Sequence, residues 1–198
     1  MPLLILGLLR FYNLACLVTW VLILHLHVKN LTKVNYLLVH QRCTYHIFNL
    51  IVKTGLKRID SYLEAFRTAI NFLNSSNQRI ALFKSYCISK GLRPRKFDLD
   101  MDVWWNSTYL MLKHFVPYKE VFCVWITTNH GENLLTRDHF IVAEHVLKFL
   151  EVFYDATLVL SGVYYPTAPL VLHHILHIAE HLHELEKIIQ ISEIFLLL

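Results

Sequence analysis

Thirteen histidines are the first candidates for chemistry in this sequence of 198 residues. His173, His177 and His181 recur every four residues, so they fall on one face of a predicted helix, and neutral imidazole is a common metal ligand. Three ligands spread over two helical turns span roughly 12 Å, however, and cannot meet at one ion. The HExxH zinc motif is also absent. We therefore predict neither a metal site nor a cofactor.

A Cys-x-x-His pair is the second candidate for metal chemistry. Cys43 and His46 lie one helical turn apart, which makes at most half of a zinc site. No second Cys/His pair at zinc-finger spacing accompanies them, and the four cysteines show no CxxC spacing. A structural role for this pair is the better interpretation.

Nucleophilic and acid–base signals are sparse. The sequence has no GxSxG motif, no glycine-rich phosphate loop and only five glycines. No Asp or Glu precedes Asp60, which excludes a mechanism that needs an acid on an early strand of this chain. Asp98, Asp100 and Asp102 could bind a stray cation on a flexible loop, but no partner acid from a central strand is evident.

Two adjacent tryptophans mark the remaining candidate site. Residues 103–112 read VWWNSTYLML, in which Trp104 and Trp105 precede a small polar triplet that begins at Asn106. A buried Trp needs a partner for its N–H, so the two indoles can hardly share one core. One of them is therefore expected to do something else.

The elements that carry these residues are predicted to be helices. Residues 42–56 predict a helix whose apolar face contains Ile47, Leu50 and Ile51, with Gly55 interrupting it. Further helices are expected at 79–90, on either side of Pro117, and at 168–190, and the segment GLRPRKF reads as a linker. Only the short apolar segment 35–41 reads as a strand.

Two long stripes of apolar residues, spaced three and four apart, predict amphipathic helices that face a core. Both stripes need partners, so we expect both to be buried. The first comprises Leu56, Ile59, Leu63, Phe66, Ile70 and Leu73, and the second Phe140, Ala143, Leu147, Leu150, Tyr154 and Leu158.

The composition is unusually apolar for a soluble domain, at 55% hydrophobic and 17% charged residues with a mean hydropathy of +0.41. The net charge of +4 is compatible with a polyanionic partner but does not demonstrate one. Residues 11–28 contain no Lys, Arg, Asp or Glu and approach the length of a membrane span. The extension 1–34 is therefore either a membrane or secretory segment or sequence not selected for folding, and the apolar tail 188–198 raises the same alternatives.

Three blocks of the sequence resemble plant hAT-superfamily transposases of the RICESLEEPER and DAYSLEEPER group. They are VHQRCTYHIFNLIVKTGL, DMDVWWNSTYLMLKHF and LKFLEVFYDATLVLSGVYYPTAPLVLHHI, in the family's order. The resemblance covers residues 35–187 and includes the RCxxHxxNL pattern, in which Cys43, His46 and Asn49 form a structural motif. It implies a mainly α fold, a helical array that corresponds to the helical insertion of an RNase H-like transposase. At most a short strand of the RNase H sheet is expected beside it.

The resemblance also bears on function. The family reads Arg-Trp-Asn-Ser-Thr where this chain has Trp104-Trp105-Asn106-Ser-Thr, so Trp105 matches the family Trp and Trp104 replaces an Arg. These three residues are the candidate DNA contacts: an indole can stack on an unpaired base. The alternative is that Trp105 only anchors the helical core.

The family's catalytic acids are two Asp before the RCxxH block and a Glu near the far end, and the chain lacks both Asp. We therefore expect a truncated, catalytically inactive transposase-like protein that is not an enzyme. Weak DNA binding, homo-oligomerisation and a nuclear location are what the resemblance implies for it. The alternative is a small membrane-anchored protein that uses residues 11–28 as a span.

Overall fold

The computed structural model describes residues 44–130 and 134–161, with isolated helical positions between 173 and 184. Every regular element in these ranges is a helix, and they contain no strand, which confirms the predicted mainly α class. No described helix is long and apolar enough to cross a membrane. Four predictions fall outside the described residues, namely those on the extension 1–34, the strand 35–41, Cys43 and the tail 188–198.

The chain divides into two compact units. One consists of Asp60–Lys148, and the other combines Met1–Ile59 with Phe149–Leu198. Helix α7 (Arg137–Leu160) contributes to both units. Each unit is described separately.

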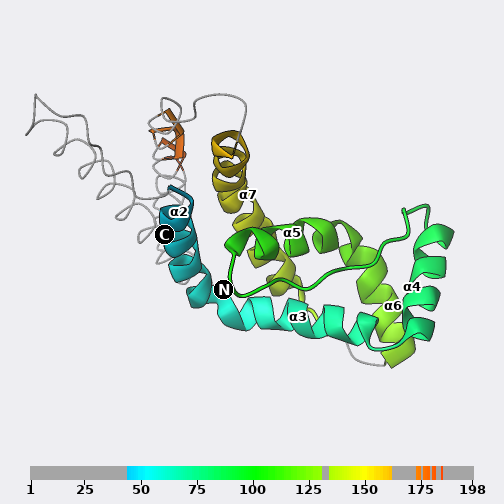
Figure 1. Ribbon diagram of the computed structural model, residues 1–198. Coiled ribbons are helices and arrows are strands. Elements are labelled where there is room, and N and C mark those ends of the chain that lie inside the picture. The colour runs from blue at the N-terminus through cyan, green and yellow to red at the C-terminus, as the bar shows by residue number, and fades with distance from the viewer. Residues whose placement is uncertain are drawn as a thin grey trace, which may run out of the picture. The chain divides into compact units, whose positions relative to one another are not determined.

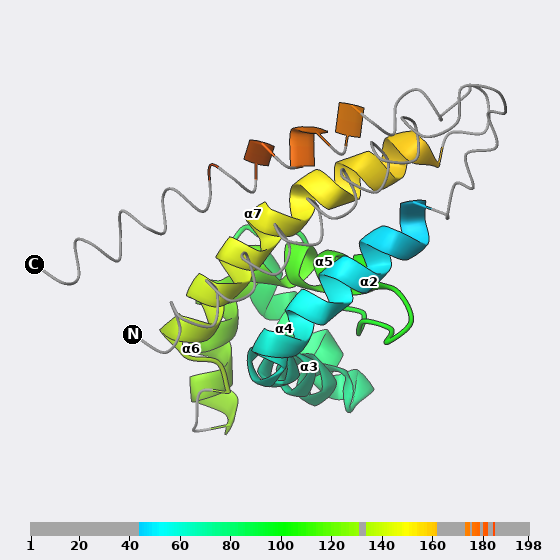
Figure 2. The same ribbon diagram turned by 90° about the vertical axis from the view of Figure 1, so that its left-hand side faces the viewer.

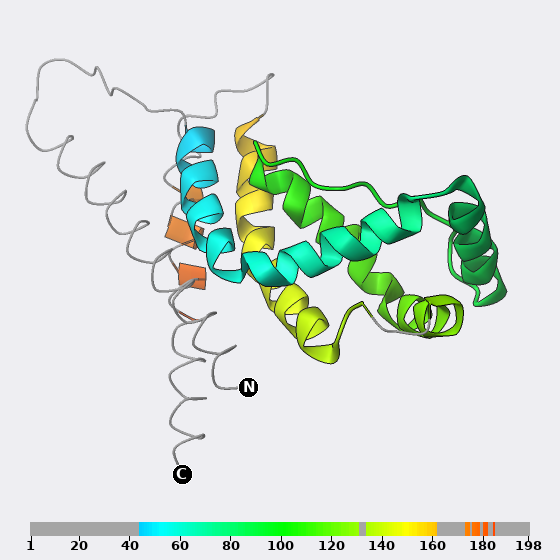
Figure 3. The ribbon, with the colours of Figure 1, turned by 90° about the horizontal axis from the view of Figure 1, so that it is seen from below.

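The Asp60–Lys148 unit is built from α3 (Asp60–Asn74), α4 (Asn77–Ser89), α5 (Trp105–Phe115), the 3-10 turn η2 (Val116–Tyr118), α6 (Lys119–His130) and the first part of α7. Helices α4 and α6 pack together near the C-terminal end of α3 (Figures 1 and 3). Helix α5 belongs to the same unit and leads through η2 into α6.

The first apolar stripe is buried throughout, as predicted. All six residues from Leu56 to Leu73 lie in the core, although the helix is divided: α2 ends at Leu56, the 3-10 turn η1 (Lys57–Ile59) follows, and α3 begins at Asp60. Ala69 is buried on the same face. The spacing therefore identifies the buried face correctly and misses only the 3-10 turn.

Aromatic rings fill the core of the Asp60–Lys148 unit. Phe115 contacts Phe66, Phe97 and Phe122 edge-on, with ring centroids 5.9, 5.0 and 5.1 Å apart. Phe83 extends the cluster from α4, with its ring centroid 6.4 Å from that of Phe122. Edge-to-face pairs add roughly 0.5–1.5 kcal/mol each beyond the burial of their area. These contacts fix α5 against α3 and α6, and α4 against α6.

A glycine ends α4 and turns the chain into the linker. The N–H of Leu92 donates to the Cys87 carbonyl at 2.9 Å and that of Gly91 to the Ile88 carbonyl at 3.0 Å, which is the Schellman pattern. Gly91 has φ of +73°, a conformation that residues with a Cβ adopt at a cost. The backbone direction after α4 is thereby set by Gly91.

The linker between α4 and α5 is irregular, as predicted, but it is packed rather than loose. Phe97 is buried, and its carbonyl accepts a hydrogen bond from Asn74 Nδ2 at 2.7 Å. The Tyr118 hydroxyl donates to the carbonyl of Arg93 at 2.7 Å. Because Arg93 and Phe97 meet the C-terminal end of α5 and η2 while Asp100 meets Thr108, the linker runs antiparallel to α5.

The second unit pairs α2 (Thr44–Leu56) with the Phe149–Leu160 end of α7, and the two helices lie side by side in Figures 1 and 2. The rings of Phe48 and Phe153 meet edge-on at 5.7 Å. The predicted apolar face of α2 is wrong at Leu50, which is 54% exposed, whereas Phe48 and Val52 are buried. Helix α2 is apolar around most of its circumference, so spacing alone does not fix its buried side.

The second apolar stripe is only partly buried, which corrects the prediction. Phe140, Ala143 and Leu150 are buried, but Leu158 is 54% exposed. The buried side of α7 runs instead through Val142, Val146, Phe149, Phe153 and Ala156. At 100° per residue these positions are offset by roughly a third of a turn from the predicted stripe. Both sets satisfy the same spacing, because α7 carries apolar residues on most of its surface.

Candidate functional site

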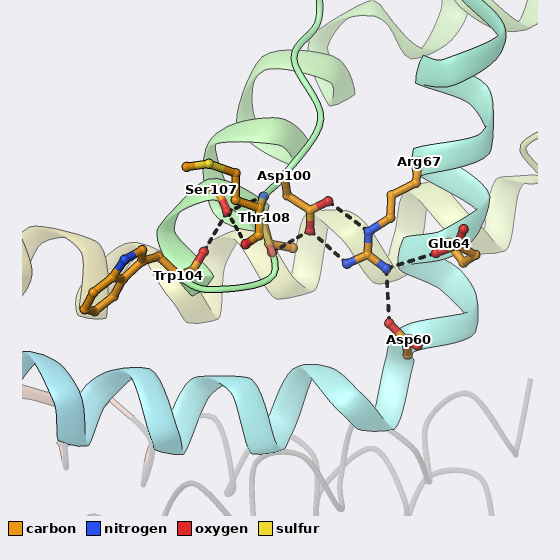
Figure 4. A network of polar contacts seen from close by, with 8 residues as sticks. Asp60, Glu64, Arg67, Asp100, Trp104, Ser107 and Thr108 are labelled. Carbon is orange, nitrogen blue, oxygen red and sulfur yellow. Dashed lines mark hydrogen bonds and ion pairs between the residues drawn. The ribbon is translucent and has the colours of Figure 1, made fainter.

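The candidate site is the turn that precedes and opens α5, residues Asp100–Thr108, which we call the tryptophan turn. Trp104 is the N-cap residue of α5, with φ −127° and ψ 124°. Its side chain makes no capping hydrogen bond, and Ser107 supplies the polar contacts at this end of the helix. The Met101 N–H donates to Ser107 Oγ at 2.9 Å, and the Ser107 hydroxyl donates to the Trp104 carbonyl at 2.6 Å (Figure 4). The Ser107 hydroxyl therefore connects Met101, near the start of the turn, with Trp104 at the start of α5.

A buried ion pair joins this turn to α3. Arg67 Nε and Nη2 donate to the two carboxylate oxygens of Asp100, each at 2.8 Å, in a bidentate arrangement (Figure 4). The Thr108 hydroxyl donates to Asp100 Oδ2, also at 2.8 Å. The side chain of Asp100 is only 3% exposed and that of Arg67 20%. The fork of Arg matches carboxylate geometry, so this pair fixes orientation as well as distance.

Arg67 also contacts two acids on its own helix. Its Nη1 lies 3.1 Å from Asp60 Oδ1 and 3.1 Å from Glu64 Oε2, both on exposed side chains. Exposed pairs of this kind contribute little on their own. They keep the guanidinium oriented toward Asp100.

The protonation states follow from these contacts. Burial alone would raise the pKa of the Asp100 carboxyl, but hydrogen bonds from Arg67 and Thr108 and the charge of Arg67 lower it below its ordinary value. Hydrogen bonds with Asp100 raise the pKa of the Arg67 guanidinium, against the opposing effect of burial. Both groups stay charged throughout the physiological range.

The hydrogen-bonding capacity of Asp100 is largely used within the fold. A carboxylate has about four lone-pair sites, and three of those on Asp100 already accept hydrogen bonds. The cation beside the Asp100 carboxylate is the guanidinium of Arg67. Within the ranges that the structure describes, no group of three or more His, Cys, Asp or Glu side chains is placed to hold a metal.

The two tryptophans have different environments. Trp105 is 2% exposed and Trp104 is 48% exposed. Trp105 therefore lies in the core, and the exposed indole is that of Trp104. Asn106 is half-buried, and its Oδ1 accepts no hydrogen bond from any described residue.

The other predicted motif is described only in part. Cys43 lies outside the described residues, and of His46 the structure describes the helical backbone alone. Asn49 is half-buried on α2. The structural role predicted for these three residues stays a prediction. The histidine run is likewise partial: the described rings of His173 and His174 meet at 5.5 Å.

Sequence reasoning missed the partnership of Arg67 with Asp100. The two residues are 33 positions apart, and helical spacing carries no information about such a pair. One signal was present: Asp100, Ser107 and Thr108 all lie in the block that resembles the transposase family. Its polar residues prove to be those that build the turn.

A comparison of the sequence with family models identifies the helical unit. Residues 41–149 match the model described as the ZBED1 RNase-like helical domain. The chain belongs to this family. The match includes the whole Asp60–Lys148 unit and therefore the tryptophan turn.

Known relatives of this RNase-like helical domain confirm the predicted resemblance to plant hAT transposases. The Zea mays protein named "Putative AC transposase" is 31% identical over 140 residues, covering 66% of this chain and 17% of that protein. Zinc finger BED domain-containing proteins RICESLEEPER 2 and RICESLEEPER 1 of Oryza sativa subsp. japonica are 26% and 25% identical over 134 residues, each covering 67% of this chain and 19% of the relative. The chain thus spans less than a fifth of the length of these relatives. No solved structure matches it.

Proposed function

We propose that this chain is a DNA-associated helical domain of the transposase-like family that does not itself cleave DNA. The observation that carries the proposal is an exposed indole, Trp104, on a turn that Arg67, Asp100 and Ser107 hold rigidly. The relative named as an AC transposase supports DNA as the partner, because transposases act on DNA.

The exposed indole suits single-stranded or distorted DNA. Stacking of a base on an aromatic side chain is worth about 1–3 kcal/mol and tolerates any base. A side chain held on an ordered turn loses less entropy on binding than one on a mobile loop. Trp104 is thus the proposed stacking residue, while Trp105 and Asn106 set its position from the first turn of α5.

The number and contacts of the acidic side chains support the proposal that the chain does not cleave DNA. Cleavage by RNase H-like transposases needs carboxylates that hold two divalent ions between them. No Asp or Glu precedes Asp60, and Asp60, Glu64 and Asp100 all bind Arg67. Glu144 pairs with Lys119 at 2.7 Å. These acids are engaged in ion pairs rather than facing one another across a metal site.

Fluorescence anisotropy with a labelled single-stranded oligonucleotide tests the proposed DNA contact. We expect Trp104→Ala to weaken binding by roughly tenfold, which corresponds to the loss of one stacked base. Trp104→Arg, which introduces the family residue, should tighten binding modestly. The matched control is Leu82→Ala, which removes an apolar side chain that is 52% exposed on α4. Equal affinities for the wild-type chain, Trp104→Ala and Leu82→Ala would refute the contact.

We also infer a nuclear location and self-association, both from the family to which the domain belongs. Fractionation of cells that express a tagged chain tests the first, and light scattering of the purified chain tests the second. Nuclear material and a mass above that of one chain are expected. Carbonate-resistant membrane material would contradict the nuclear location and favour the anchored alternative.

A further inference from the structure

We propose that the exposed segment Lys90–Lys96, together with the Lys113–His114 end of α5, is a surface that binds the phosphate backbone of a nucleic acid. The inference rests on the proposed DNA association and names a second contact for it. Trp104 lies at the opposite end of α5 and would contact a base. The basic surface would supply most of the electrostatic attraction.

The charge distribution is the first argument. Residues 65–97 contain seven Lys or Arg residues and no Asp or Glu, although the whole chain has a net charge of only +4. Four of the seven cations fall within the seven residues Lys90–Lys96, and all four are exposed. No ion pair among the described residues neutralises Arg93, Arg95 or Lys96. Glu64 and Asp98 are the acids that border this stretch, so it is a local concentration of positive charge rather than a general excess.

The backbone of the segment is held in place, which is the second argument. Gly91 turns the chain after α4, the carbonyl of Arg93 accepts the Tyr118 hydroxyl, and Phe97 is buried. Pro94 further restricts the backbone between these points. Arg95 and Lys96 are thus presented outward from a fixed backbone. Binding would cost mainly the ordering of side chains, not of a loop.

The end of α5 adds to the same surface. Burial lowers the pKa of His114 first, and the charges of Arg95 and Lys113 lower it further, against the opposite effect of Asp98. Independent geometry brings the linker to this end of α5: the Phe97 ring lies 5.0 Å from that of Phe115, and the Tyr118 hydroxyl donates to the Arg93 carbonyl at 2.7 Å. Lys113 is exposed, with its Nζ 2.9 Å from the Tyr109 hydroxyl. The surface therefore continues from the linker onto α5.

The dimensions suit adjacent phosphates. Arg93 and Lys96 are three residues apart and so at most about 10 Å apart along the chain. A DNA strand advances 3.4 Å per base pair along its axis, so these cations can reach neighbouring phosphates. Helix α5 rises about 14 Å between residues 105 and 114, roughly four such steps from the basic surface to Trp104. One strand along α5 would reach both.

Two alternatives to this surface fit less well. A depression of about 430 Å³ next to the segment is lined by Lys90 and Lys119, but Glu120 and Glu144 line it as well, and Lys119 is paired with Glu144. It has no excess of positive charge. A membrane surface is the other polyanion, but Lys90–Lys96 has no exposed large apolar side chain that would insert into a bilayer.

The test compares two triple variants of the full chain that lose the same charge. The first variant removes the proposed surface by replacing Arg93, Arg95 and Lys96 with Gln. The second, the control, removes three exposed cations elsewhere by replacing Lys57, Arg58 and Arg137 with Gln. Affinity for a single-stranded oligonucleotide is measured by anisotropy from 50 to 200 mM NaCl. Thermal unfolding followed by circular dichroism verifies that both variants are folded.

At 50 mM NaCl we expect the first variant to bind the oligonucleotide more weakly than wild type by roughly tenfold or more. The plot of log K against log salt concentration should become less steep, with the magnitude of its slope smaller by about 2. The control triple should change the affinity about threefold or less and keep most of the slope. Trp104→Ala should weaken binding without changing the slope, because it removes no charge.

The remaining outcomes separate this inference from the proposed function. If the wild-type chain binds DNA and both triple variants bind alike, the basic surface is refuted while DNA association stands. If the wild-type chain does not bind DNA at any salt concentration, both are refuted. If the chain binds phosphatidylserine vesicles more tightly than DNA through Arg93, Arg95 and Lys96, the surface takes a lipid and the inference is also refuted.

Discussion

Arg67 and Asp100 form a two-point ion pair across 33 residues of sequence, with both N–O distances at 2.8 Å. The pair connects α3 to the tryptophan turn, and Thr108 joins it from α5. A buried charge must be compensated in this way, because an unpaired carboxylate at this site would be strongly unfavourable. The position of Trp104 therefore depends on a contact made on another helix.

Removing one partner of this pair should destabilise the domain. We expect Asp100→Asn to lower the free energy of unfolding by roughly 3 kcal/mol, because it removes the buried counter-ion of Arg67 and leaves only the exposed carboxylates of Asp60 and Glu64 beside that charge. Urea unfolding followed by circular dichroism measures the change. Asp98→Asn is the control: Asp98 is exposed, so its replacement should stay within about 0.5 kcal/mol of wild type. Equal stabilities for the two variants would contradict the structural role of the pair.

The adjacent tryptophans should differ sharply in their contribution to stability. Trp105 is 2% exposed, so Trp105→Ala should cost roughly 3–5 kcal/mol by creating a cavity. Trp104→Ala should cost about 1 kcal/mol or less, since Trp104 is half exposed and its side chain makes no capping bond. Thermal unfolding of both variants provides the comparison. If Trp104→Ala proved the more destabilising, the assignment of anchor and exposed indole would be reversed.

Acid should weaken the fold through His139. Burial lowers the pKa of His139 below 6.5, with Asp138 opposing, and the Thr136 N–H donates to its Nδ1 at 3.1 Å, which requires that nitrogen to be unprotonated. The unfolded chain therefore binds more protons than the folded chain below about pH 6.5. The free energy of unfolding should be unaffected by His139 above that pH and should fall as the pH decreases toward the lower folded-state pKa.

Urea titrations at several pH values between 7.5 and 5 measure this dependence. His114 and His174 also have pKa values lowered by burial, so they add a decrease of the same sign. His139→Gln removes one titrating group and can still accept the Thr136 hydrogen bond through its amide oxygen. The variant should lose part of the decrease between pH 6.5 and 5. An identical pH dependence in both proteins would show that His139 does not contribute.

Local periodicity is enough to predict the helices that the structure describes between Thr44 and Leu160, and the first buried stripe. The stripe from Leu56 to Leu73 alternates apolar and charged residues clearly, so one face alone can be buried, and it is. Helices α2 and α7 are apolar on most sides, and there the spacing selected Leu50 and Leu158, which are exposed. Where several faces satisfy the same period, tertiary partners decide which is buried.

The candidate site was predicted less completely, for a related reason. The block around Trp104 and Trp105 is recognisable as a motif, but its sequence suggests only a DNA contact for Asn106 and a stray cation for Asp100. Asp100 and Ser107 instead hold the turn, and Arg67 completes it from a distant helix. Pairs between distant residues leave no periodic signal in one sequence, so only the folded structure reveals them.

The most direct test of the proposed function is a nicking assay on supercoiled plasmid with purified chain and millimolar Mg²⁺ or Mn²⁺. A gel shift first verifies that the same sample binds DNA. Without carboxylates that position two metal ions, DNA cleavage by this chain should be many orders of magnitude slower than cleavage by an enzyme that holds both ions. We therefore predict that the plasmid stays supercoiled, as in a control without protein. Metal-dependent nicking that disappears in Asp102→Asn would contradict the account of a DNA-associated domain without cleavage activity.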